Sequence, residues 1–171
     1  DWFRNATGYM IPTKRMQDQD FVTRFMAFYL LGYENYEPDL DNFMNTCLEK
    51  INKGIISDDS ISKMKIDFSK SMRLAEEIFG DDAFRKRESE NDKKKPINKA
   101  YFEVIAVSFA NLSEDDCNRL AANKKYFKEL LMDEMRNNKS YNNSFSGGTG
   151  QRESVKLRFT KFNEIIGKAL K

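Results

Sequence analysis

The sequence predicts an all-α fold of six to eight helices in an irregular orthogonal bundle, without a significant β-sheet. Only 8 glycines and 3 prolines interrupt the 171 residues, and apolar residues recur three and four positions apart along most of the chain. The β-like runs are short, at 55–56 and 104–107, and the second lies within a helical stripe. We therefore expect residues 1–171 to form a single helical domain or subdomain around one core.

Seven segments carry the apolar periodicity of amphipathic helices. The first is almost entirely apolar and rich in aromatic residues, which predicts a buried central helix. The second is the clearest, because its apolar residues fall at i, i+3, i+4, i+7, i+8 and i+11 from Leu40 onward, after the start signal Pro38-Asp39. In chain order, the expected helices cover residues 21–31, 40–51, 60–79, 96–111, 114–122, 124–136 and 152–170.

The boundaries of the later helices depend on particular residue types. Gly80 is expected to end the third helix, and Pro96 is expected to begin the fourth. Ser113 and Asp116 resemble a capping box at the start of the fifth. The last two are indicated by their apolar stripes, formed by Phe127, Leu130, Leu131 and Met135 in one and by Val155, Phe159, Phe162 and Ile166 in the other.

Two segments are expected to be mobile loops. Residues 85–95 contain no apolar side chain and carry six positive and three negative charges, which is typical of a solvated loop. Residues 137–150 are polar and rich in glycine, and ordered loops of this length are often functional.

The absence of histidine excludes several functions within this chain. It excludes Ser-His-Asp and Cys-His nucleophiles, an imidazole general base and His-ligated metal sites. Cys47 and Cys117 lie 70 positions apart among apolar neighbours, so we interpret them as small buried hydrophobic residues in a reducing, cytoplasmic protein. No apolar run approaches the ~20 residues of a membrane span, so we expect no membrane partner. The 29 basic and 27 acidic residues give a net charge of +2, so the average surface is not a strong attractor of polyanions.

Two arginines lie at positions that call for a partner. Arg24 interrupts the most apolar helix, where a charge must be paired or point into a cleft. With Arg15, Asp18 and Asp20 it forms either a ligand-facing polar cluster or a structural salt bridge that fixes the first helix. Arg158 lies beside the apolar stripe of the last helix, so its side chain is expected to reach inward toward a carboxylate.

The region before the last helix is a second candidate site. The stretch 147–150 could hold a phosphate on its backbone amides, although it lacks the GxxxxGK[ST] pattern and no strand precedes it. The alternative is a flexible connector in which Thr149 caps the helix. Arg152 and the following basic residues form either a polyanion-facing surface or a solvated helix face. The acidic pairs before helices, 58–59, 81–82 and 115–116, are explained by capping, and we expect no metal site.

Four strings along the chain carry a family resemblance. Residues 15–28 resemble an "R…(D/E)…LRFLAF" helix, residues 79–85 an "IFG..AFR" segment, residues 96–105 an "INKALFE.I" helix and residues 155–159 a "V..RF" helix. In this order they resemble the helical C-terminal part of the N-terminal, ParB-like nucleotide-binding domain of GmrSD-type restriction endonucleases.

The resemblance implies nucleotide-dependent restriction of foreign DNA in bacteria, with a nucleoside triphosphate and Mg as cofactors of the full-length protein and none in this fragment. The family's DGQQR-like string is absent, as is its histidine-dependent nuclease domain. We therefore expect a fragment that is catalytically incomplete alone, with the missing N-terminal half as its partner and DNA as a further one. The aromatic start at Trp2-Phe3 fits this expectation. Arg15, Arg24, Lys99 and Arg158 match charged positions of the strings and are the binding candidates.

Two other functions stay open. The chain could be a stand-alone helical adaptor that docks a protein partner through residues 85–95 and 137–150. A weaker alternative is a small helical enzyme that uses carboxylates and a metal ion.

Overall fold

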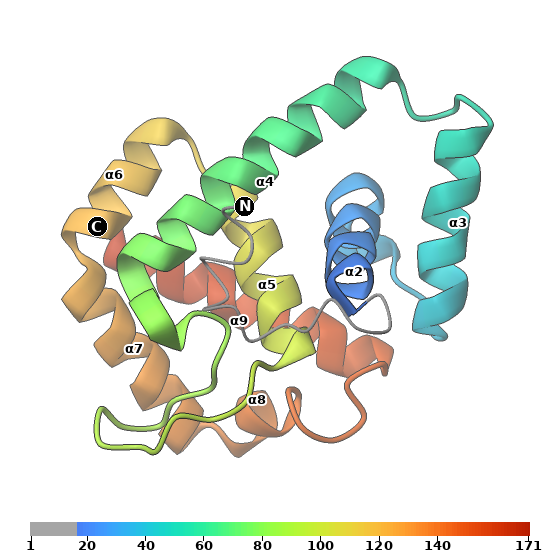
Figure 1. Ribbon diagram of the computed structural model, residues 1–171. Coiled ribbons are helices and arrows are strands. Elements are labelled where there is room, and N and C mark those ends of the chain that lie inside the picture. Colours follow the sequence, from blue (N-terminus) through green and yellow to red (C-terminus); the bar gives the residue numbers. More distant parts are fainter. Residues whose placement is uncertain (1–16) are drawn as a thin grey trace.

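The helix that organises the fold is α5 (Lys99–Ala110), in which every residue from Ala100 onward is buried. The computed structural model describes residues 17–171 and places α5 in the middle of the molecule, with α2 and α3 on one side and α6 and α7 on the other (Figure 1). Helix α5 packs on α2, α4 and α9. The helices around it are α2 (Gln17–Leu31), α3 (Leu40–Asn52), α4 (Asp58–Phe79), α6 (Glu114–Ala122), α7 (Lys124–Asn137), α8 (Lys139–Asn143) and α9 (Arg152–Ala169).

The all-α prediction is confirmed for the described residues, which form eight α-helices and two short 3₁₀ turns, η2 (Tyr33–Asn35) and η3 (Gly80–Asp82), and no strand. Side-chain caps explain several helix starts, because the first amide groups of a helix lack partners within it. In each case an oxygen of the residue before the helix accepts a hydrogen bond from the amide three residues on. The capping residues are Asp39, Ser57, Asn98, Ser113 and Asn138.

Three parts of the sequence prediction differ from the structure. Helix α2 already includes Gln17, four residues before the expected start at residue 21. Helix α5 begins at Lys99 and not at Pro96, because the Asn98 side chain caps it and the Asn98 amide donates to the carbonyl of Phe84. The prediction of an unbroken loop over 137–150 is wrong for residues 139–143, which form α8.

Helix α8 and the residues after it are part of the core. Tyr141 and Phe145 are almost completely buried, and their rings meet edge to face with a centroid separation of 5.0 Å. Phe145 also meets the ring of Tyr101 on α5 at 5.3 Å. Aromatic side chains therefore hold this segment against the central helix.

Residues 85–95 have no helix or strand, as expected, but they make specific contacts. The Arg87 guanidinium donates to both carboxylate oxygens of Asp82 at 2.6 Å. Nζ of Lys86 donates to the Asn142 side chain at 2.6 Å and to Ser146 at 2.8 Å. The segment is thus joined to η3 and to the region of α8.

Helix α9 contributes to two aromatic clusters. Phe159 packs against Phe28 of α2 at 5.4 Å, and Phe162 packs against Phe109 of α5 and Phe127 of α7 at 5.9 and 5.8 Å. Pairs of this kind stabilise a core beyond the area that they bury.

Cys47 and Cys117 are free and buried, as predicted. Within residues 17–171, no helix combines the length and the apolar character that crossing a membrane requires.

Candidate functional site

A buried carboxylate on α5 joins the two arginines that the sequence singled out. Glu103 is 1% exposed, and each of its oxygens accepts a hydrogen bond from a different guanidinium. Oε1 accepts from Nη1 of Arg24 on α2 at 2.7 Å, and Oε2 accepts from Nη2 of Arg158 on α9 at 2.8 Å. Because a buried charge is tolerated when it is paired and hydrogen-bonded, this arrangement fixes three helices around one carboxylate.

The network continues along α2 to the start of α5. Nε of Arg24 donates to both carboxylate oxygens of Asp20 at 3.1 Å, and Nζ of Lys99 lies 2.8 Å from Oδ2 of the same residue. Burial by itself would raise the pKa of Asp20, but Lys99 and Arg24 outweigh it and the pKa is lowered. Burial would likewise lower the pKa of Arg24, but the charges of Glu103 and Asp20 raise it. Asp20 and Arg24 are therefore ionised at neutral pH.

Arg158 also fixes the segment that leads into α9. Its Nη1 donates to the carbonyl of Thr149 at 2.7 Å and to that of Ser144 at 3.3 Å. The alternative in which Thr149 caps the helix is wrong, because Gln151 holds the N-cap position and makes no side-chain cap bond. Thr149 thus contributes its backbone oxygen to the network.

A pocket of about 230 Å³ lies at the start of α5, and most residues of this network line it. Arg24, Lys99 and Arg158 supply three positive charges, and Glu103 with the adjoining Asp20 supplies two negative charges, which leaves one positive charge in excess. Lys99 keeps half of its side chain exposed, and Nη2 of Arg24 has no hydrogen-bond partner within residues 17–171. The other lining residues are Leu40, Asn98, Ala100, Phe145 and Thr149.

Not every residue predicted for the site lies in it. Arg15 lies outside the described residues. Asp18 stays at the first turn of α2, where its carboxylate accepts from the amide of Gln19. Arg152 pairs with Glu37 at 2.6 Å and does not line the pocket.

The structure brings together Asp20, Arg24, Lys99, Arg158 and the carbonyl of Thr149. The sequence prediction that Arg158 reaches inward to a carboxylate is confirmed, but its partner Glu103 was missed. One signal could have found it: Glu103 is the single charged residue between Ala100 and Ala110, in a run apolar enough to be buried.

None of the acidic pairs supplies the N-cap of its element: Ser57 caps α4, Ser113 caps α6, and η3 has no side-chain cap. Residues 58–59 and 115–116 occupy the first turns of α4 and α6, and residues 81–82 lie in η3. Among residues 17–171, no three or more Asp, Glu or Cys side chains gather as metal ligands would.

Comparison with known proteins gives no family for this chain. No family model matches it, and neither a curated protein nor a solved structure does.

Proposed function

We propose that the chain is the helical portion of a GmrSD-like restriction or defence protein, and that the pocket at the start of α5 receives a phosphate group of the nucleotide. The supporting observation is that strings of the family resemblance, which lie far apart in the sequence, meet at this pocket. Arg24, Lys99 and Arg158 come from three of the four strings and line one pocket, in which the two arginines bind the buried Glu103 and Lys99 pairs with Asp20 beside them.

The chemistry of the pocket suits a phosphate oxygen. Guanidinium and ammonium groups make strong, charge-assisted hydrogen bonds to phosphate, and the pocket has one positive charge in excess. Helix α5 begins at Lys99, so the positive end of its dipole lies at the pocket. A volume of about 230 Å³ is small for a whole nucleotide, so the base and sugar would contact residues outside the pocket.

Glu103 and Asp20 already accept hydrogen bonds from the guanidinium groups, so the arginines would stay in place when a ligand binds. The ligand would then be bound by Lys99 and by Nη2 of Arg24. In this proposal the described chain supports nucleotide and DNA recognition without performing a reaction, and the parts that complete a nucleotide centre lie elsewhere in a GmrSD-like protein.

The proposal is tested by measuring the affinity of the 171-residue chain for fluorescent GTP, ATP and a short DNA duplex, with Lys99→Ala as the variant. Loss of one partly exposed phosphate contact is expected to weaken binding about three- to tenfold. Lys65→Ala removes an exposed lysine of α4 outside this pocket and should leave affinity unchanged. Equal affinities for the two variants would contradict the phosphate site, and absence of all binding would favour the adaptor.

A further inference from the structure

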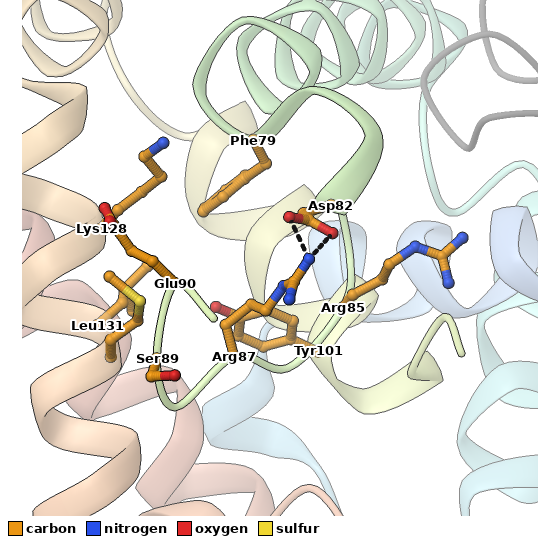
Figure 2. Close-up of a pocket in the computed structure, with 10 residues that line it drawn as sticks. Phe79, Asp82, Arg85, Arg87, Ser89, Glu90, Tyr101, Lys128 and Leu131 are labelled. Carbon is orange, nitrogen blue, oxygen red and sulfur yellow. Dashed lines mark hydrogen bonds and ion pairs between the residues drawn. The ribbon is translucent and has the colours of Figure 1, made fainter. Parts of the chain in front are cut away.

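A second pocket, of about 250 Å³, lies between the end of α4, residues 85–95 and α7. Its innermost residues are mostly apolar: Leu131 and Tyr101 are buried, while Phe79 and Met132 are half-buried. Figure 2 shows Phe79 and Leu131 on different sides of the space and the Tyr101 ring between the helices, with its hydroxyl turned toward the side of Leu131. The pocket thus combines an apolar lining with one buried hydroxyl group.

The Tyr101 hydroxyl is a stable hydrogen-bond donor. Burial raises the pKa of Tyr101 above that of ordinary tyrosine, so the hydroxyl keeps its proton at neutral pH. A ligand oxygen placed over the apolar lining would accept from it.

The charged residues around the pocket are not equivalent. Arg87 is neutralised by its two hydrogen bonds to Asp82, the dashed lines in Figure 2. The Arg85 side chain points away from the other residues drawn there and donates to the carbonyls of Asp81 and Lys95.

Two lining charges are left, a half-buried Lys128 and an exposed Glu90, and neither forms an ion pair within the described part of the chain. The Lys128 residue is less exposed than Glu90 and lies on the helix that also supplies Leu131 and Met132, so we expect the apolar lining to favour an anion over a cation.

We propose that this pocket binds a small aromatic monocarboxylate, with its ring against Phe79, Leu131 and Met132 and its carboxylate accepting from the Tyr101 hydroxyl. The Lys128 side chain, whose ammonium is turned away from Tyr101 in Figure 2, would swing inward to pair with the bound carboxylate. The volume lies slightly below the ~300–1,000 Å³ common for drug-sized ligands, which limits the ligand to a single ring with a short acidic arm. The site shares no lining residue with the pocket at the start of α5, so it is independent of the function proposed above.

The test is a titration of the ¹⁵N-labelled 171-residue chain with phenylacetate, followed by two-dimensional NMR. We expect saturable shifts at the amides of residues 79, 101 and 131, with a Kd of about 5 mM or tighter for a ligand of this size. Phenylacetamide has the same shape without the charge. Its affinity should be lower than that of phenylacetate by at least about fivefold. Acetate, which lacks the ring, should give no saturable shift at these residues.

Two lysine variants test whether the charge of Lys128 contributes to binding. Lys128→Gln should weaken phenylacetate binding about fivefold while leaving phenylacetamide unaffected. Lys125→Gln, an exposed lysine on the same helix outside this pocket, should behave as the wild type. Absence of saturable shifts in the wild type would overturn the proposal, as would equal phenylacetate affinity of the wild type and Lys128→Gln.

Discussion

Arg158 donates from Nη2 to Oε2 of Glu103 at 2.8 Å, and both side chains are 1% exposed. The pair joins the last helix to the central one, and Arg24 on α2 completes the arrangement through the other oxygen. A carboxylate so deeply buried between two guanidinium groups belongs to the stability of the fold as well as to the candidate site.

Glu103→Gln is expected to destabilise the protein strongly. The change keeps the shape but removes the negative charge, so the buried Arg158 guanidinium loses its carboxylate partner and Arg24 is left with Asp20. Breaking one buried pair costs about 3–5 kcal/mol of unfolding free energy, and we expect a loss in this range by urea denaturation. Glu129→Gln on the exposed face of α7 is the control and should stay within about 0.5 kcal/mol of the wild type. A loss below about 1 kcal/mol for Glu103→Gln would show that the charge is not needed there.

Asn98 is expected to contribute more to the unfolding free energy than an ordinary helix-capping residue does. Its Oδ1 accepts from the amide of Tyr101 at 2.9 Å, and its Nδ2 donates to the carbonyl of Phe145 at 2.8 Å. Asn98→Ala removes both bonds and should cost about 1–2 kcal/mol. Asn98→Asp keeps the cap but loses the donor, so its stability should fall between those of the other two proteins. If Asn98→Asp were as unstable as Asn98→Ala, the cap would contribute little.

Gly148 and Gly147 should respond differently to alanine. Gly148 has φ of 60°, and a Cβ there would meet the Gln151 side chain at 3.1 Å. Gly148→Ala is therefore expected to lower the unfolding free energy by about 1 kcal/mol. A Cβ at Gly147 would meet nothing within 4 Å, so Gly147→Ala should be neutral or slightly stabilising. Thermal unfolding compares the two, and equal effects would contradict the backbone described for this turn.

Stability should fall in acid partly through Asp67. Burial alone would raise the pKa of this residue, but hydrogen bonds from Lys63, Tyr29 and Lys70 lower it below the ordinary 3.8. Because the folded-state pKa is the lower one, the stabilisation is complete well above 3.8 and is lost as the pH falls through the folded-state value.

Asp67→Asn should therefore reduce the difference in urea midpoint between about pH 6 and about pH 3. Asp115→Asn, on the exposed first turn of α6, should keep the pH dependence of the wild type. An unchanged pH dependence in Asp67→Asn would show that this carboxylate does not contribute to the loss of stability in acid.

The helices could be predicted from the sequence because their signals are local. Periodicity and caps placed α3 and α6 within a residue or two of their observed ends. Helix α8 was missed because five residues are too few to show a period, and its burial depends on Tyr101 and Phe145 meeting across the core.

The candidate site was predictable only in part, for a related reason. The apolar surroundings of Arg24 and Arg158 indicated that each needs a partner. The shared partner, Glu103, lies 79 and 55 positions away along the chain, and helix patterns contain no information about contacts over such separations. The tertiary fold alone brings these three residues together.

The most direct test of the central claim is an NMR titration of the ¹⁵N-labelled chain with GTP and, separately, with guanosine. A phosphate site at the start of α5 predicts that GTP shifts the amides of Lys99, Ala100 and Thr149 most, and that guanosine, which has no phosphate, does not shift them. GTP shifts spread over the exposed basic residues of α9, or no saturable shift near Lys99, would contradict it.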